Sequence, residues 1–197
     1  MKPGQRLALD LAFKGERTYL HGTDILNALE KNIGPLQRVS FRMHKVATHG
    51  LCAIGLPFEG VTTRDLAGVL LFGAEEPRSQ IGLEENEDQP IEGRYAYDEA
   101  AVVAAATFEK GGAVMSRNPE FSFIEQLVAL NKALLQKEIE QQNVKWYFTQ
   151  LDVAFLPKDF TKLRLTVVQR LGIRLVKSKI EIDGASFGSI AFSGVTL

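Results

Sequence analysis

The residues from Phe108 to about Gln142 limit the fold of this chain more than any other stretch. An extended segment from Val102 to Phe108 leads into a loop with two adjacent glycines and a proline. After the loop, apolar residues recur at the three- and four-residue spacing of an α-helix. They form two neighbouring stripes, Phe123, Leu127, Leu130 and Leu134 beside Ile124, Val128, Asn131 and Leu135, and the stretch becomes polar from Gln136 to Gln142. A helix that is apolar over more than half of its circumference must be covered, so we expect a sheet around it.

The residues that can cover this helix follow it directly. Residues 144–195 read as strand after strand, with apolar and polar positions alternating most clearly from Val176 to Asp183. The Asp183-Gly184 pair predicts a hairpin turn, and Phe187 to Phe192 predicts a closing strand. One long helix followed by an antiparallel meander predicts an α+β fold with the helix against one sheet face.

The first half of the chain follows a similar order. We expect strands at Arg6–Phe13 and Arg17–His21, and a short helix at Thr23–Ile33. Extended segments are then expected at 37–57 and 66–72. Residues 74–93 carry seven acidic residues and one basic residue, which favours a linker, an exposed loop or an exposed long hairpin. We therefore predict an α+β region at 1–73, an acidic linker or loop at 74–93 and a second domain at 94–197.

Composition limits the classes of function. The 23 basic and 24 acidic residues of this 197-residue chain nearly balance, so charge gives no reason to expect nucleic acid or an anionic membrane as a partner. The single cysteine, Cys52, lies in an apolar run and is expected to be a buried thiol. The apolar segment near the N-terminus is short and interrupted by Asp10, unlike a signal peptide, so a soluble cytoplasmic protein is the expectation. No spacing typical of a metal site or phosphate loop occurs, and neither a metal nor a cofactor is expected.

The residues from 94 to 195 resemble the hotdog fold and, more narrowly, the acyl-carrier-protein dehydratases of fatty-acid synthesis. Pro119 precedes the acidic residue Glu125 by six positions, as a proline precedes the catalytic acid of those enzymes. Phe108 matches the phenylalanine that ends their strand before the helix, and residues 155–160 (FLPKDF) are similar to a Phe-x-x-Pro pattern before an alternating strand, with one residue fewer between the phenylalanine and the proline. The resemblance implies a sheet curled around a central helix and an acyl thioester of acyl-carrier protein or coenzyme A as substrate. It also implies a homo-oligomer.

The sequence departs from the dehydratase pattern at the catalytic histidine. That histidine lies fourteen residues before the helix acid in the family, and the position here is Gly111, followed by Gly112. A glutamine that usually follows the acid by four is Ala129. Because dehydration requires both an acid and a base, each worth about 10²–10⁴-fold in rate, another residue would have to replace this histidine.

The N-terminal half is the expected source of such a residue. Its order of strand, helix and strands predicts a degenerate first repeat, which would make the chain a double hotdog. Sites of hotdog proteins lie where two such units meet, so the resemblance implies that a histidine of the first half takes part. The candidates are His21, His44 and His49, and His21 is preferred because it precedes the expected helix. The alternative is that all three have surface or structural roles.

Glu125 is the predicted catalytic acid or base, although a first-turn glutamate also stabilises a helix without any role in chemistry. Asn131 lies on an apolar stripe, where its amide would either satisfy backbone groups or bind substrate. Gly111 and Gly112 would either let a substrate approach the backbone or form a plain loop. Three functions follow: a dehydratase- or thioesterase-like enzyme, a non-catalytic acyl-binding or partner subunit, and a structural module without ligand.

Overall fold

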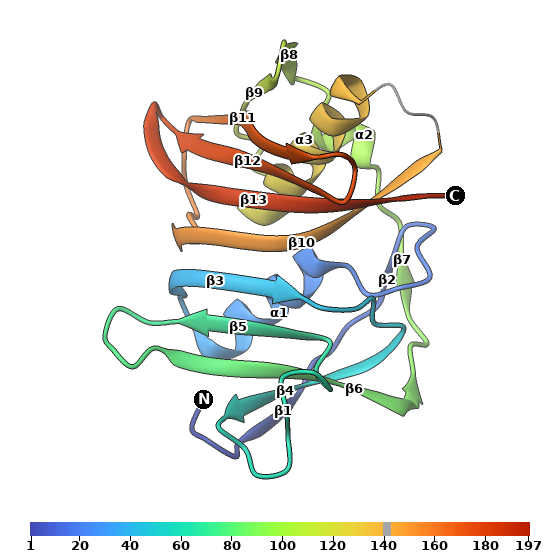
Figure 1. Cartoon of the computed structure of the whole chain (residues 1–197), viewed down its shortest axis with the longest axis vertical. Helices are drawn as coiled ribbons and strands as arrows, with labels where there is room; N and C mark the ends of the chain where they lie inside the picture. The colour runs from blue at the N-terminus through green and yellow to red at the C-terminus, as the bar shows by residue number, and fades with distance from the viewer. Residues whose placement is uncertain (140–142) are drawn as a thin grey trace. The chain divides into compact units, whose positions relative to one another are not determined.

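The computed structural model describes residues 1–139 and 143–197, which divide into two compact units, Met1–Tyr97 (unit 1) and Asp98–Leu197 (unit 2). Each unit contains one antiparallel sheet and one longer helix (Figure 1). Such antiparallel sheets with few helices fit the hotdog fold expected from the sequence. The part of the predicted long helix that covers residues 140–142 lies outside the described residues.

Unit 1 has a five-stranded antiparallel sheet in the order β1-β4-β6-β5-β3. A separate parallel pair joins β2 to β7, with Lys14 opposite Tyr95. The helix α1 buries Ile25, Leu26 and Leu29. The elements of unit 1 are β1 (Arg6–Ala8), β2 (Phe13–Lys14), α1 (Gly22–Ile33), β3 (Gln37–Met43), β4 (His49–Leu56), β5 (Gly68–Phe72), β6 (Ser79–Pro90) and β7 (Arg94–Tyr95).

The acidic stretch at 74–93 is largely a strand in the structure. Its residues 79–90 form β6, which pairs with both β4 and β5. Ile81 and Leu83 of β6 are completely buried, whereas residues 86–90 are exposed. Four of the seven acidic residues lie in this strand and the other three lie outside it, whereas Ile81 and Leu83 place the first half of the strand in the core.

Unit 2 has a six-stranded antiparallel sheet in the order β10-β13-β12-β11-β9-β8. The predicted hairpin at Asp183-Gly184 is confirmed: both residues have positive φ, 51° and 83°, and they join β12 to β13. The elements of unit 2 are α2 (Glu99–Val102), β8 (Thr107–Glu109), β9 (Gly112–Ser116), α3 (Phe123–Glu138), β10 (Val144–Phe155), β11 (Lys162–Leu171), β12 (Leu175–Ile182) and β13 (Ala185–Thr196).

The helix α3 lies across one face of the unit 2 sheet and packs on β9 and β11 (Figure 1). The sheet presents alternate residues to it, for example Val176, Ser178 and Ile180 of β12, all fully buried. Both predicted stripes of α3 are buried over their whole length. Ten of the sixteen residues of α3 are buried: the eight residues of the two stripes, together with Gln126 and Ala129.

Residues 102–108, expected to be extended, differ from that expectation. Asp98 begins the short helix α2, because its carboxylate accepts hydrogen bonds from the backbone N–H groups of Ala100 and Ala101. The alanines that follow have no β-branch and favour helical and turn conformations, so the extended part is only Thr107–Glu109.

The two sheets differ in how the chain passes through them. In unit 2 the consecutive strands β11, β12 and β13 are neighbours. In unit 1 the chain leaves β4, forms β5 one position further away, and returns as β6 between the two. Unit 1 thus has one longer helix and a five-stranded sheet, against six strands in unit 2. The last two strands of the unit 1 sheet, β5 and β6, lie in the opposite order to the last two strands of unit 2, β12 and β13.

Candidate functional site

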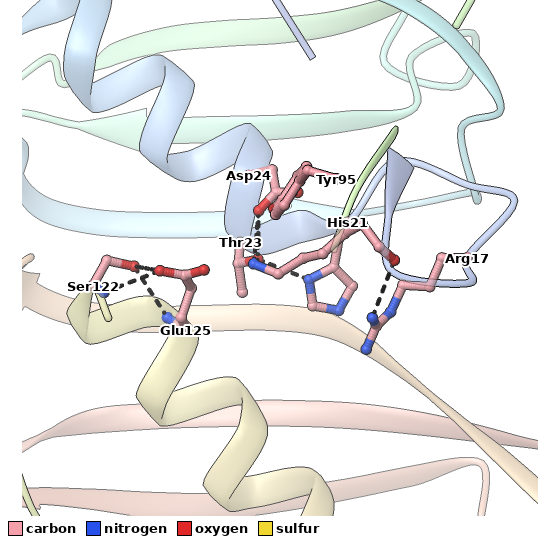
Figure 2. Close-up of polar contacts among 8 residues, drawn as sticks. Arg17, His21, Thr23, Asp24, Tyr95, Ser122 and Glu125 are labelled. Carbon is pink, nitrogen blue, oxygen red and sulfur yellow. Dashed lines mark hydrogen bonds and ion pairs between the residues drawn. The ribbon is translucent and has the colours of Figure 1, made fainter. Parts of the chain in front are cut away.

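The N-terminus of α3 holds Glu125 in a fixed position. Ser122 is the N-cap residue, and its hydroxyl accepts a hydrogen bond from the Glu125 N–H at 3.4 Å. In return, Oε2 of Glu125 accepts hydrogen bonds from the backbone N–H and the hydroxyl of Ser122, at 3.0 and 2.9 Å (Figure 2). This reciprocal pattern is a capping box, which satisfies N–H groups that would otherwise lack partners. The half-buried carboxylate is therefore ordered and lies where the helix has partial positive charge.

The loop before α3 is fixed by the next residue, Gln126, which is fully buried. Its side-chain oxygen accepts a hydrogen bond from the Asn118 N–H at 2.7 Å, and its amide nitrogen donates to the Phe121 carbonyl at 2.9 Å. Gln126 thus joins both ends of the loop that contains Pro119 to the first turn of the helix. Nothing in the sequence pattern distinguished Gln126 from an exposed polar residue.

Aromatic side chains hold the same helix end from the other direction. The ring of Phe123 makes edge-to-face contacts with Phe160 and Phe187, with ring centres 5.8 Å apart in both pairs. Phe155 also contacts Phe187 edge-to-face at 5.1 Å. The segment 155–160 singled out in the sequence therefore packs around the start of α3, where Phe123 precedes Glu125 by two residues.

His21 lies in unit 1 at the N-cap of α1 and is 7% exposed. Its side chain makes no capping bond to the helix backbone; instead Nδ1 lies 2.7 Å from the Thr23 hydroxyl. Residues 17–21, expected as a strand, form an irregular connection that ends at this histidine. Figure 2 shows the imidazole beside Thr23 and Asp24 at the start of α1.

Next to His21, unit 1 buries a lysine completely. Nζ of Lys14 donates hydrogen bonds to Oγ1 of Thr23 at 3.2 Å and to Oδ1 of Asp24 at 3.0 Å. The ammonium also lies 4.1 Å from the centre of the Tyr97 ring, and the hydroxyl of Tyr95 donates to Oδ2 of Asp24 at 2.7 Å. We call Lys14, His21, Thr23 and Asp24 the buried polar cluster of unit 1, to which Tyr95, itself 40% exposed, is joined through Asp24. No local pattern indicates this burial, because the partners of Lys14 lie up to 83 positions away in the sequence.

The other two histidines have different surroundings. His44 is exposed, as its alternation with Val39 and Phe41 indicated. His49 accepts or donates at Nδ1 to the Thr48 hydroxyl, and Glu85 lies beside it. Burial opposes ionisation of Glu85, but the backbone N–H groups of Thr48 and His49 and the nearby ammonium of Lys45 lower the pKa of its carboxyl.

Gly111 lies in the turn between β8 and β9, and Gly112 is the first residue of β9. The Gly111 N–H donates to the carboxylate of Glu138, at the far end of α3, with a distance of 2.8 Å. Glu138 is thirteen residues after Glu125, which corresponds to about 20 Å along a helix. The structure therefore does not bring the glycine pair near Glu125. The positive φ of Gly111 (70°) and the close approach of Gly112 to the β11 backbone account for both glycines structurally.

Asn131 is fully buried within α3 and has no partner for either amide atom among residues 1–139 and 143–197. The expectation that it satisfies backbone groups does not hold in this part of the chain. The hydroxyl of Ser178, on the strand face toward α3, is also buried and unpaired among the same residues. Buried polar groups are hydrogen-bonded in more than about nine of ten cases, so these two require an explanation.

No three or more His, Cys, Asp or Glu side chains gather in the described part of the chain in a way that could hold a metal ion. None of the helices within the same residues combines the length and apolar character needed to cross a bilayer.

No protein-family model matches this chain, and no curated protein sequence matches it significantly. It is similar to several solved structures. One is the bifunctional dehydratase-cyclase domain in ambruticin biosynthesis, with 13% identity over 91% of this chain and 82% of that one and a TM-score of 0.48. A second is a protein of unknown function with a hotdog fold from Alicyclobacillus acidocaldarius, with 9% identity over 96% and 90% and a TM-score of 0.48. A third is a monomeric dehydratase domain from a trans-AT polyketide synthase split module, with 12% identity over 98% and 97% and a TM-score of 0.42.

Proposed function

We propose that this protein acts on acyl thioesters and catalyses the reversible hydration of a 2-enoyl thioester to a 3-hydroxyacyl thioester, with Glu125 as acid or base. The observation that carries the proposal is the ordered, half-buried carboxylate of Glu125 at the start of the longest described helix. It follows Pro119 by six residues, the spacing of the catalytic acid in the dehydratases that the sequence resembles.

The proposed chemistry requires two proton transfers. Dehydration removes a proton α to the thioester carbonyl and delivers a proton to the leaving hydroxyl, so one group must act as base and another as acid. Glu125 is one of these groups, and His21 is proposed as the second. The helix N-terminus and the two donors of Ser122 stabilise the carboxylate form of Glu125 between turnovers.

We further propose that the chain is a double hotdog whose first repeat is unit 1. In support, each unit contains one helix of twelve or more residues, α1 or α3, and an antiparallel sheet of at least five strands. The reversed order of the last hairpin of unit 1 is consistent with a first repeat that has diverged from the second.

Asn131 is proposed to bind a polar part of the acyl substrate, because neither of its amide atoms has a partner in the described structure. Gly111 and Gly112 are left out of the proposed site, since the Gly111 N–H already donates to Glu138. The carrier is expected to be acyl-carrier protein or coenzyme A.

A panel of trans-2-enoyl thioesters tests the proposal by loss of enoyl absorbance. Glu125→Gln is the decisive variant, because glutamine also completes a capping box and keeps the helix start intact. We expect turnover by the wild-type protein and a loss of at least about 100-fold in the variant. Equal rates in both proteins would remove Glu125 from the site.

The second candidate function is a non-catalytic acyl-binding or partner subunit. The glycine at position 111, where the dehydratase pattern has histidine, favours it. Mass spectrometry of the purified protein for a bound acyl group tests this function. A retained ligand together with no turnover and no thioester hydrolysis on any chain length would support it over the enzyme.

A further inference from the structure

The hydrogen atoms in the buried polar cluster of unit 1 can be assigned individually. Oγ1 of Thr23 has three neighbours within hydrogen-bond distance: Nζ of Lys14 at 3.2 Å, Oδ1 of Asp24 at 3.0 Å and Nδ1 of His21 at 2.7 Å. A hydroxyl supplies one hydrogen and accepts at two lone pairs. The ammonium of Lys14 only donates, so it uses one of the two lone pairs.

The hydroxyl hydrogen of Thr23 then has two destinations, Asp24 or His21. If it pointed at His21, the Thr23 and Asp24 oxygens would lie 3.0 Å apart with no hydrogen between them, and one of them carries a negative charge. If it points at Asp24, the second lone pair is left for a hydrogen on Nδ1 of His21, and all three contacts become hydrogen bonds. The second arrangement makes each of the three Thr23 contacts a hydrogen bond and is favoured, because a buried polar contact without a hydrogen between its atoms is destabilising.

We propose that Lys14, Thr23 and Asp24 hold neutral His21 as the Nδ1–H tautomer, so that Nε2 is the ring nitrogen able to take up a proton. Lys14 and Thr23 are then positioning residues for the histidine. The catalytic meaning of this assignment rests on the proposed function, but the tautomer itself does not.

Two features restrict the imidazole further. His21 is the N-cap residue of α1, with an extended backbone, and its carbonyl accepts hydrogen bonds from the N–H groups of Asp24 and Ile25 at 3.0 and 3.2 Å. The side chain is 7% exposed and its ring lies tilted against Tyr19, with ring centres 6.4 Å apart. The backbone and one ring nitrogen are therefore both fixed, which is the arrangement that sets a tautomer in histidine sites.

The tautomer is measured directly by two-bond ¹⁵N–¹H correlation of the imidazoles in the full chain, from about pH 6 to pH 10, a range above and around the ordinary imidazole pKa of about 6.5. Only three histidines are present, and His21→Gln assigns the signal. We expect neutral His21 to carry its hydrogen on Nδ1, whereas His44 and His49 serve as internal references. A neutral His21 with its hydrogen on Nε2 would overturn the proposal.

The variants Thr23→Ser and Thr23→Val separate a positioning role from a merely structural one. Serine keeps the hydroxyl and should keep the Nδ1–H tautomer, whereas valine removes the acceptor and should shift His21 toward Nε2–H. Unchanged tautomers in folded Thr23→Val would contradict the inference. If valine prevents folding, Asp24→Ala provides the second test, because without the carboxylate the Thr23 hydroxyl can rotate toward His21 and the Nδ1–H signal should weaken.

Kinetics extends the test if the protein is an enzyme. Thr23→Val should then lower kcat by about 10–100-fold with little change in KM, and Thr23→Ser should restore it. A wild-type protein without turnover but with the Nδ1–H tautomer would refute the proposed hydratase activity and leave the tautomer assignment standing.

Discussion

Replacement of Asn131 by leucine should stabilise unit 2, which is the reverse of the usual effect of a core substitution. Leucine has nearly the shape of asparagine but no polar atoms. Both amide atoms of Asn131 are buried without a partner in the described structure, and each such group costs about 1–3 kcal/mol. We expect a net gain of about 2 kcal/mol in the free energy of unfolding.

The matched control is Gln126→Met on the same helix. Gln126 is equally buried, but its amide holds the Asn118 N–H and the Phe121 carbonyl at 2.7 and 2.9 Å. Methionine keeps the shape and removes both bonds, so this variant should lose about 1–3 kcal/mol.

Urea unfolding measures both changes. With a slope of about 2 kcal/mol per molar urea, Asn131→Leu should raise the midpoint by about 1 M, and Gln126→Met should lower it by a similar amount. A lowered midpoint for Asn131→Leu at unchanged slope would refute the reasoning, because it would mean that the amide is satisfied in the folded protein. If Asn131 also contacts substrate, the stabilised variant should bind the acyl ligand more weakly.

Three further predictions test other parts of the structure. Glu125→Gln should change the melting temperature little, whereas Ser122→Ala should cost about 1 kcal/mol in thermal unfolding because it removes the helix cap; a large loss in Glu125→Gln would mean that its charge is structural. The pKa of the Glu85 carboxyl is lowered in the folded protein, so its contribution to stability is present above the ordinary value of 4.5 and is lost as the pH falls through the folded value. Glu85→Gln should therefore flatten the acid limb of a stability curve, and an unchanged limb would contradict this assignment. Gly188→Ala should cost about 3 kcal/mol in urea unfolding, since a Cβ would lie 2.0 Å from the Asp152 carbonyl oxygen. Gly184→Ala has open space around the new Cβ but a φ of 83°, and should cost about 1 kcal/mol. Equal costs would show that the backbone at Asp152 moves away from the new Cβ without loss of stability.

The elements of unit 2 could be predicted from periodicity because each is long and one-sided. The helix α3 was expected from its two apolar stripes, and its start could have been located more sharply. The order Ser122-x-x-Glu125 before an apolar run is the sequence pattern of a capping box, and it assigns Glu125 a structural task in addition to the catalytic one proposed.

The features that could not be predicted depend on contacts between distant residues. The burial of Lys14 requires Asp24 of α1 and the rings of Tyr95 and Tyr97, which come from a second segment more than 70 positions away from Lys14. Strand order in unit 1 is equally non-local, because nothing in residues 79–90 specifies insertion between β4 and β5. The acidic composition of that stretch was the stronger local signal, but three of its seven acidic residues lie outside β6 and only Glu87 and Asp88 lie on the exposed end of the strand.

The parallel β2–β7 pair has a consequence for synthesis of the chain on the ribosome. Phe13 and Lys14 pair with Arg94 and Tyr95. The strand β2 leaves the ribosome early, but it can pair only after β7, near the end of unit 1, has been synthesised. Until then, the charged end of Lys14 has Asp24 but neither tyrosine, and closing so long a loop is a slow, entropically costly step. A nascent chain stalled before Arg94 should be cut by proteases near its first twenty residues, and one extended well past Tyr97 should be protected there.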